Sequence, residues 1–254
     1  MERRGRLAEE EDTEWEVEED RFVTSGGIRM PVPATTGQLR KHVKDMKIGD
    51  YIVWSYHNDD FFEFGADTSR YTECPLEGIP NGETSKGKYW YGIKVDKGLL
   101  ISDRVLRNQW SWNTLNNYKF IEGISMTIST VQGILRSPTG GVAYADANGN
   151  KSLTDQGYGG WPTNNEWDKY IVKSSLEGTI TAGDDVVWHW NKMFSWCQET
   201  PVNGLIYRTT TATNTNRIRR GYGEDMTNPE RLSFGPSSQA DVSVGFRPVF
   251  EYKE

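Results

Sequence analysis

Four short motifs follow one another in the second half of the chain, and they constrain its fold more than any other feature. Residues 161–170 (WPTNNEWDKY) contain a proline, capping residues and an early Glu, which predict a helix start. Residues 185–190 (DVVWHW) alternate, which predicts a strand with both Trp side chains on one face. Residues 217–223 hold an Arg-Arg-Gly turn, and residues 244–249 predict a closing strand. This mixture favours an α+β fold.

The composition agrees with short strands and long loops. Ten Trp, twelve Tyr and 26 Gly suit such a fold better than a helix bundle. No run of 18 apolar residues is present, so we expect no membrane span. The first residues lack the apolar segment of a secretory signal, so we expect any extracellular role to follow release within an assembly or by lysis.

The charge of the chain is concentrated at its start. Of the 36 acidic and 29 basic residues, ten and three lie in residues 1–20, which leaves 26 of each in the remainder. A block of like charge this dense stays extended, so residues 1–34 are predicted to form a flexible acidic arm and linker, and residues 35–254 the folded domain. The arm is either a solvated tail or a docking segment for a basic partner, such as another virion protein. Outside residues 217–220 there is no basic stripe, so we expect no nucleic-acid partner.

Local patterns predict further elements in the first half. Apolar spacing and N-capping residues indicate short helices, and alternating apolar residues indicate strands, two of which form a hairpin around an Asp-Lys-Gly turn. The predicted helices are 36–46 and 111–118, the predicted strands are 51–54, 89–95 and 99–101, and turns are expected to dominate residues 121–160.

Taken in order, the four motifs resemble those of the formylglycine-generating-enzyme family, also called sulfatase-modifying-factor domains. That family has a Pro-Thr-x-x-Glu-Trp helix start, a Val-Trp-Glu-Trp strand, an Arg-Gly-Gly turn and a terminal Gly-Phe-Arg. The resemblance covers residues 121–252 and implies a C-type-lectin-like fold of short twisted antiparallel strands, two or three helices and long loops. In that domain, residues 35–120 would be the N-terminal part and residues 121–254 the part with the motifs.

The same fold serves as a ligand-binding tip in phage proteins and in proteins of diversity-generating elements. Residues 101–105 and 118–123 also resemble segments of phage and prophage virion proteins. Both resemblances imply a virion or extracellular location.

The enzyme of this family would need paired reactive cysteines after the Arg-Gly turn. Residues 220–254 contain no cysteine, and Cys197 lies beside Trp196, an apolar setting that raises a thiol pKa. We therefore expect no catalysis. The two cysteines, Cys74 and Cys197, could form a disulfide only if the fold brings them together, and buried free thiols are the alternative.

The resemblance places contact residues between the Arg-Gly turn and the closing strand. Loops on a rigid scaffold often carry recognition, and Tyr and Arg often dominate binding energy. The candidate ligand-binding residues are Tyr222, Glu224, Asp225, Arg231 and Phe234. An ordinary surface loop is the alternative. Other motif residues are predicted to be structural: Trp167, Trp188, Trp190 and Phe246 in the core, Arg247 in an internal charge-assisted hydrogen bond and His189 partly buried.

A second candidate site is a loop with oxygen-bearing side chains at alternate positions. Asp146, Asn148, Asn150 and Asp155 could surround a hard cation such as Ca²⁺. The loop lacks the closing Glu of an EF-hand, and Asn-Gly is also common in plain turns. Calcium and a simple turn both stay open.

Three hypotheses of function follow. The first is a non-enzymatic phage virion protein, from a tail or surface appendage, that binds a host-surface glycan or protein and forms a homo-oligomer. The second is a purely structural virion component. The third is an oxidase-like enzyme of the formylglycine family.

Overall fold

In the computed structural model, residues 22–25, 28–57, 62–76, 86–222 and 228–254 are described. The chain divides into two compact units, residues 1–32 and 33–254. In the first unit, β1 (Phe22–Ser25) pairs antiparallel with β2 (Ile28–Pro31), in a stretch for which the sequence predicts only a linker. Glu2 and the other acids of the predicted arm lie outside the described residues.

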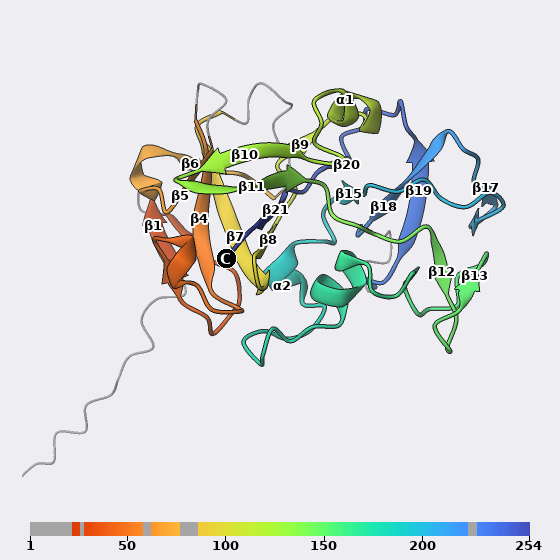
Figure 1. The fold of residues 1–254 in the computed structure, drawn as a ribbon, viewed down its shortest axis with the longest axis horizontal. Helices are drawn as coiled ribbons and strands as arrows, with labels where there is room; N and C mark the ends of the chain where they lie inside the picture. The colour runs from red at the N-terminus through yellow and green to blue at the C-terminus, as the bar shows by residue number, and fades with distance from the viewer. Residues whose placement is uncertain (1–21, 26–27, 58–61, 77–85, 223–227) are drawn as a thin grey trace, which may run out of the picture. The chain divides into compact units, whose positions relative to one another are not determined.

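The second unit consists mainly of short strands, with helical turns between them (Figure 1). The helical elements are η1 (Val43–Asp45), η2 (Thr68–Arg70), α1 (Trp112–Asn117), the π-helical turn η3 (Trp167–Val172) and α2 (Asp185–Trp188). The strands are β3 (Leu39–Arg40), β4 (Tyr51–Tyr56), β5 (Phe62–Phe64), β6 (Thr72–Glu73), β7 (Lys88–Asp96), β8 (Leu99–Ser102), β9 (Arg107–Asn108), β10 (Ile124–Ile128), β11 (Val131–Arg136), β12 (Ala143–Ala145), β13 (Lys151–Ser152), β14 (Gly160–Trp161), β15 (Phe194–Trp196), β16 (Ile206–Tyr207), β17 (Thr210–Thr211), β18 (Asn216–Arg220), β19 (Leu232–Pro236), β20 (Val244–Phe246) and β21 (Val249–Tyr252). The predicted mixed α+β class is confirmed at that level.

The largest sheet has nine strands, in the order β10-β11-β21-β8-β7-β4-β3, with β5 on β4 and β6 on β7. The predicted strands at 51–54, 89–95 and 99–101 are confirmed as parts of β4, β7 and β8, and β7 and β8 pair antiparallel as the predicted hairpin. Trp54 and Trp90 are directly opposite in the β4–β7 ladder, and their ring centroids are 5.7 Å apart. Both are fully buried, so this aromatic pair lies in the main hydrophobic core.

The second sheet has five strands in the order β19-β18-β15-β20-β9. Side chains that are opposite in a ladder lie on the same face, and side chains two apart along a strand do too. Arg107 lies opposite Phe246, and Arg219 lies opposite Trp196. The two pairs are connected because Phe194, two residues before Trp196, lies opposite Val244, two residues before Phe246. All of these side chains therefore lie on one face of the sheet. Figure 1 shows α1 on one side of this sheet and α2 on the other.

The predicted helix at residues 36–46 is wrong. Residues 39–40 form β3, parallel to β4, and only the short turn η1 follows. The carboxylate of Asp50 accounts for this, because it accepts hydrogen bonds from the backbone N–H groups of Gln38 and Lys47 and from Nε of Arg40. These bonds satisfy backbone donors in an extended conformation instead of a helical one. The helix predicted at 111–118 is confirmed as α1, and Ser111 caps it by accepting from Thr114 N.

Two motif predictions also need correction. Residues 185–188 form the helix α2 rather than a strand, because Asp184 caps its start by accepting from Val186 N. The helix in the first motif begins at Trp167, after an irregular stretch that follows Pro162. The predicted burial nevertheless holds: Trp167, Trp188, Trp190 and Phe246 are all in the core. Within the described ranges, no helix has the length and apolarity needed to span a bilayer.

Candidate functional site

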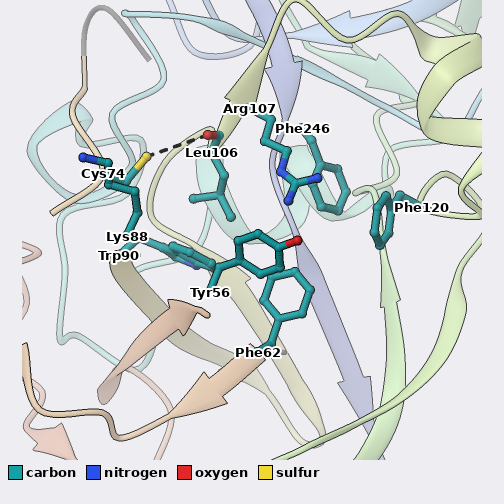
Figure 2. Close-up of a pocket in the computed structure, with 9 residues that line it drawn as sticks. All are labelled: Tyr56, Phe62, Cys74, Lys88, Trp90, Leu106, Arg107, Phe120 and Phe246. Atoms are coloured by element: carbon teal, nitrogen blue, oxygen red, sulfur yellow. Dashed lines mark hydrogen bonds between the residues drawn. The ribbon is translucent and has the colours of Figure 1, made fainter. Parts of the chain in front are cut away.

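A pocket opens where the two large sheets meet. Figure 2 shows its walls: Tyr56 at the end of β4, Phe62 on β5, Trp90 on β7, and Phe246 on β20 with Phe120 beside it. The rings of Tyr56 and Phe62 are 4.9 Å apart, and those of Phe120 and Phe246 are stacked at 5.2 Å. The pocket has aromatic walls and is narrow, because its free volume is about 10 Å³, which is room for about one water molecule.

Three polar side chains complete the pocket. The guanidinium of Arg107 lies 4.7 Å above the ring of Tyr56 and equally close to that of Trp110, which places a cation against two aromatic faces. Nζ of Lys88 donates to Oγ1 of Thr72 at 2.8 Å. Burial raises the pKa of the Cys74 thiol to about 12, so this group is a neutral thiol at pH 7 and bonds weakly to the carbonyl of Leu106.

An aromatic stack leads from this pocket to the surface. It comprises Trp110, Tyr118, Phe120 and Phe246. Tyr118 is 57% exposed, yet its ring is stacked on Trp110 at 5.2 Å and on Phe120 at 6.4 Å. The stack therefore includes one largely exposed ring, held by its neighbours, and continues to the pocket wall at Phe246.

Of the predicted ligand-binding residues, the structure describes three. Tyr222 is half-buried, with its ring edge-on to Phe194 at 5.1 Å. Arg231 is half-buried, and its guanidinium lies 5.3 Å from the ring of Tyr207. Glu224 and Asp225 lie outside the described residues.

The prediction that Phe234 lies in an irregular loop is wrong. Phe234 is only 5% exposed and lies in strand β19, opposite Ile218, within a second hydrophobic cluster. Its ring therefore packs in the core, and the segment after Gly221 is partly a strand rather than one irregular loop. The prediction missed this because Leu232 and Phe234 are only two apolar residues in a polar setting.

The proposed calcium loop forms a turn between β12 and β13. The carboxylate of Asp146 accepts hydrogen bonds from the N–H groups of Asn148 and Asn150 and from the side chain of Asn150. Asp155 accepts from Gly157 N. These contacts stabilise a turn by themselves, and across the described parts of the chain no group of three or more acidic, His or Cys side chains is placed to hold a metal. Calcium binding here stays a prediction.

Two motif arginines are fully buried, and one of them forms an ion pair. The fully buried guanidinium of Arg220 donates to both carboxylate oxygens of Asp168, at 2.5 and 3.1 Å. It also donates to the carbonyl oxygens of Gly140, Glu230 and Arg231, so all five of its donors are used. The fully buried Arg247 donates to Ser195 Oγ and to the carbonyl of Ser102, which agrees with its predicted internal role.

A second buried polar group surrounds His189. Its Nε2 lies 3.7 Å from a carboxylate oxygen of Asp103, and burial lowers the pKa of His189 to about 4. Asp103 is itself bound by Arg104, which also donates to Glu73. His189 is thus an uncharged buried side chain at neutral pH.

Both cysteines are buried free thiols, so they do not form a disulfide with each other. Burial also raises the pKa of Cys197 well above its usual range, as its apolar surroundings in the sequence indicate. Comparisons with known protein families, with curated proteins and with solved structures find no match to this chain.

Proposed function

We propose that this chain is a non-enzymatic binding protein that takes a host-surface glycan or protein on the aromatic stack. The observation that carries the proposal is Tyr118, whose ring is largely exposed but held flat between Trp110 and Phe120. Rigid Tyr and Trp rings give large contact areas at little cost in conformational entropy.

The proposed biological setting is a phage tail or surface appendage. It is supported by the order of the four motifs and by the resemblance of residues 101–105 and 118–123 to virion proteins. The order of the motifs in the sequence also supports a C-type-lectin-like domain, although residues 185–188 form a helix where the family has a strand, and the mixed α+β fold with short strands is consistent with one. In this proposal the acidic residues at the start of the chain contact other virion proteins.

The test is binding of the whole chain to glycan arrays and to intact bacterial cells. We expect Tyr118→Ala to weaken binding at least tenfold, as for an aromatic hot-spot residue. Tyr158→Ala is the matched control, because Tyr158 is 48% exposed on the separate loop after β13. Equal binding by both variants would place the ligand elsewhere. Absence of binding to any cell or glycan, with co-purification in intact particles, would favour a structural virion component instead.

A further inference from the structure

The arginines of β18 separate into two kinds. Arg220 and Ile218 lie on the face of the five-stranded sheet that packs on η3 and the second hydrophobic cluster, and Asp168 neutralises Arg220. Arg217 and Arg219 alternate with them and therefore lie on the other face. Both are half-buried, and neither forms an ion pair with an acidic side chain in the described ranges.

Both unpaired guanidiniums lie against aromatic rings. Arg217 is 4.4 Å from the ring of Trp112, and Arg219 is 4.3 Å from the ring of Phe194. Their hydrogen bonds go to neutral oxygens, since Nη1 of Arg217 donates to the carbonyls of Asn214 and Asn216 and Nε of Arg219 to Ser233 Oγ. Burial lowers the pKa of both arginines.

The nearest acidic group that acts on Arg219 is Asp241. Its field only partly opposes the effect of burial, and its own oxygens accept hydrogen bonds from Ser243 and from the side-chain amide of Gln239. The positive charge on this face is therefore left largely uncompensated. Two positively charged guanidinium groups that are partly removed from water and lack a carboxylate partner favour binding of an anion from solution.

On the neighbouring strand β19, a glycine lies beside the side chain of Arg219. Gly235 is the ladder partner of Arg217, and a Cβ atom at that position would meet Nη1 of Arg219 at 3.3 Å and Oε1 of Gln239 at 2.7 Å. The absence of a side chain there lets the guanidinium extend across β19. A glycine is favoured at position 235 because the side chains of Arg219 and Gln239 pack closely against it.

We propose that Arg217 and Arg219 form an anion-binding site for a compact carboxylate or phosphate group carried by a small ligand. Side chains two apart on a strand are separated by roughly 6.6 Å, so one such group can accept hydrogen bonds from both. An extended nucleic-acid backbone is disfavoured because residues 21–254 carry equal numbers of acids and bases. Neither arginine lines the pocket of Figure 2 or belongs to the aromatic stack.

The test uses three ligands with the same sugar ring: glucose 1-phosphate, glucuronate and glucose. Binding to the whole chain is followed by NMR, with the indole N–H of Trp112 as the local reporter. We expect both anionic sugars to bind, glucose not to bind, and the affinity to fall as salt is added. Arg217→Gln and Arg219→Gln should each weaken binding about tenfold or more.

The matched control is Lys151→Gln, which removes another cation that lies over an aromatic ring, that of Trp161. It should leave the affinity unchanged, as should Tyr118→Ala, so that failure of this site and failure of the proposed ligand face are distinguishable. Thermal melting checks that each variant is folded, and Arg219→Lys keeps the charge if the Gln variant unfolds.

Three results would overturn the proposal. The first is no binding of either anionic sugar to the wild-type chain. The second is unchanged affinity in folded arginine variants. The third is tighter binding of a single-stranded oligothymidine that requires the same arginines, which would make this a nucleic-acid site.

Discussion

His189 gives the sharpest test of the buried polar groups. The side chain is only 7% exposed and lies where the backbone leaves α2 in a left-handed conformation. Burial is the largest cause of its low pKa, and the positive charges of Arg104 and Arg247 add to it. The carboxylates of Asp103 and Asp184 oppose the shift but do not reverse it. The folded chain therefore holds an imidazole that stays unprotonated down to about pH 4.

The sign of the effect on stability follows from proton linkage. In the unfolded chain the pKa of His189 is near the ordinary value of 6.5, whereas in the folded chain it is about 4. Between these values the unfolded state binds more protons, so the free energy of unfolding falls as the pH falls. At about 1.4 kcal/mol for each pH unit, the difference amounts to about 3 kcal/mol.

The variant His189→Asn removes the titration and keeps a residue that tolerates the left-handed conformation. Urea unfolding at a series of pH values from 7.5 to 4 measures the free energy of unfolding of both proteins. We expect the variant to gain about 3 kcal/mol relative to wild type as the pH falls across this range. A difference that is constant with pH would refute the reasoning.

Glu199→Gln provides a control of opposite sign. Burial raises the pKa of Glu199 to about 7, although the N–H groups of Gly140 and Gly141 and the charge of Arg220 favour its ionised form. The folded chain holds this proton above the pH at which the unfolded chain releases it, so wild type loses stability as the pH rises from 4.5 to 7. The Gln variant should therefore gain about 3 kcal/mol relative to wild type over the same rise.

Three further outcomes follow from the buried groups and from the turn. Asp168→Asn should lower the free energy of unfolding by about 3–5 kcal/mol in a urea titration, because it leaves Arg220 buried without its counter-charge; a loss under 1 kcal/mol would contradict this. Cys74 and Cys197 should not react with a disulfide reagent in the native protein and should both react in urea, since each is at most 1% exposed. A chelator should leave the melting temperature unchanged if the Asp146 turn is held by its own hydrogen bonds, and a fall restored by added Ca²⁺ would establish a calcium site.

The elements that the sequence predicts correctly are those set by local pattern. Strand β4 and the β7–β8 hairpin have dense runs of aromatic and β-branched residues and a glycine in the turn at Gly98, and α1 has a serine cap. The prediction of a helix at 36–46 was wrong because the extended conformation found there depends on Asp50, a residue outside the segment. Apolar spacing alone could not reveal that competition.

The β10–β11 hairpin shows a different reason for failure. Its strands alternate in the expected way, but their turn is formed by Ser129 and Thr130, both with positive φ. Asn and Gly are the usual residues at such positions, so the sequence did not indicate a hairpin, and the prediction that turns dominate residues 121–160 was wrong for β10 and β11. The pocket could not be predicted either, since its lining comes from segments as far apart as Tyr56 and Phe246.

The basic segment of β18 shows what register adds to composition. In the sequence, Arg217, Arg219 and Arg220 form a single cluster of positive charge, too short for a nucleic-acid footprint. In the ladder, Arg220 lies on one face, where Asp168 binds it, and the other two lie on the opposite face without a carboxylate partner in the described ranges. Loss of Arg220 should therefore reduce stability, whereas loss of Arg217 should reduce anion binding in a protein that still folds. On β18, Ile218 and Arg220 would then serve stability and Arg217 and Arg219 a ligand, a division that a change of register by a single residue would abolish.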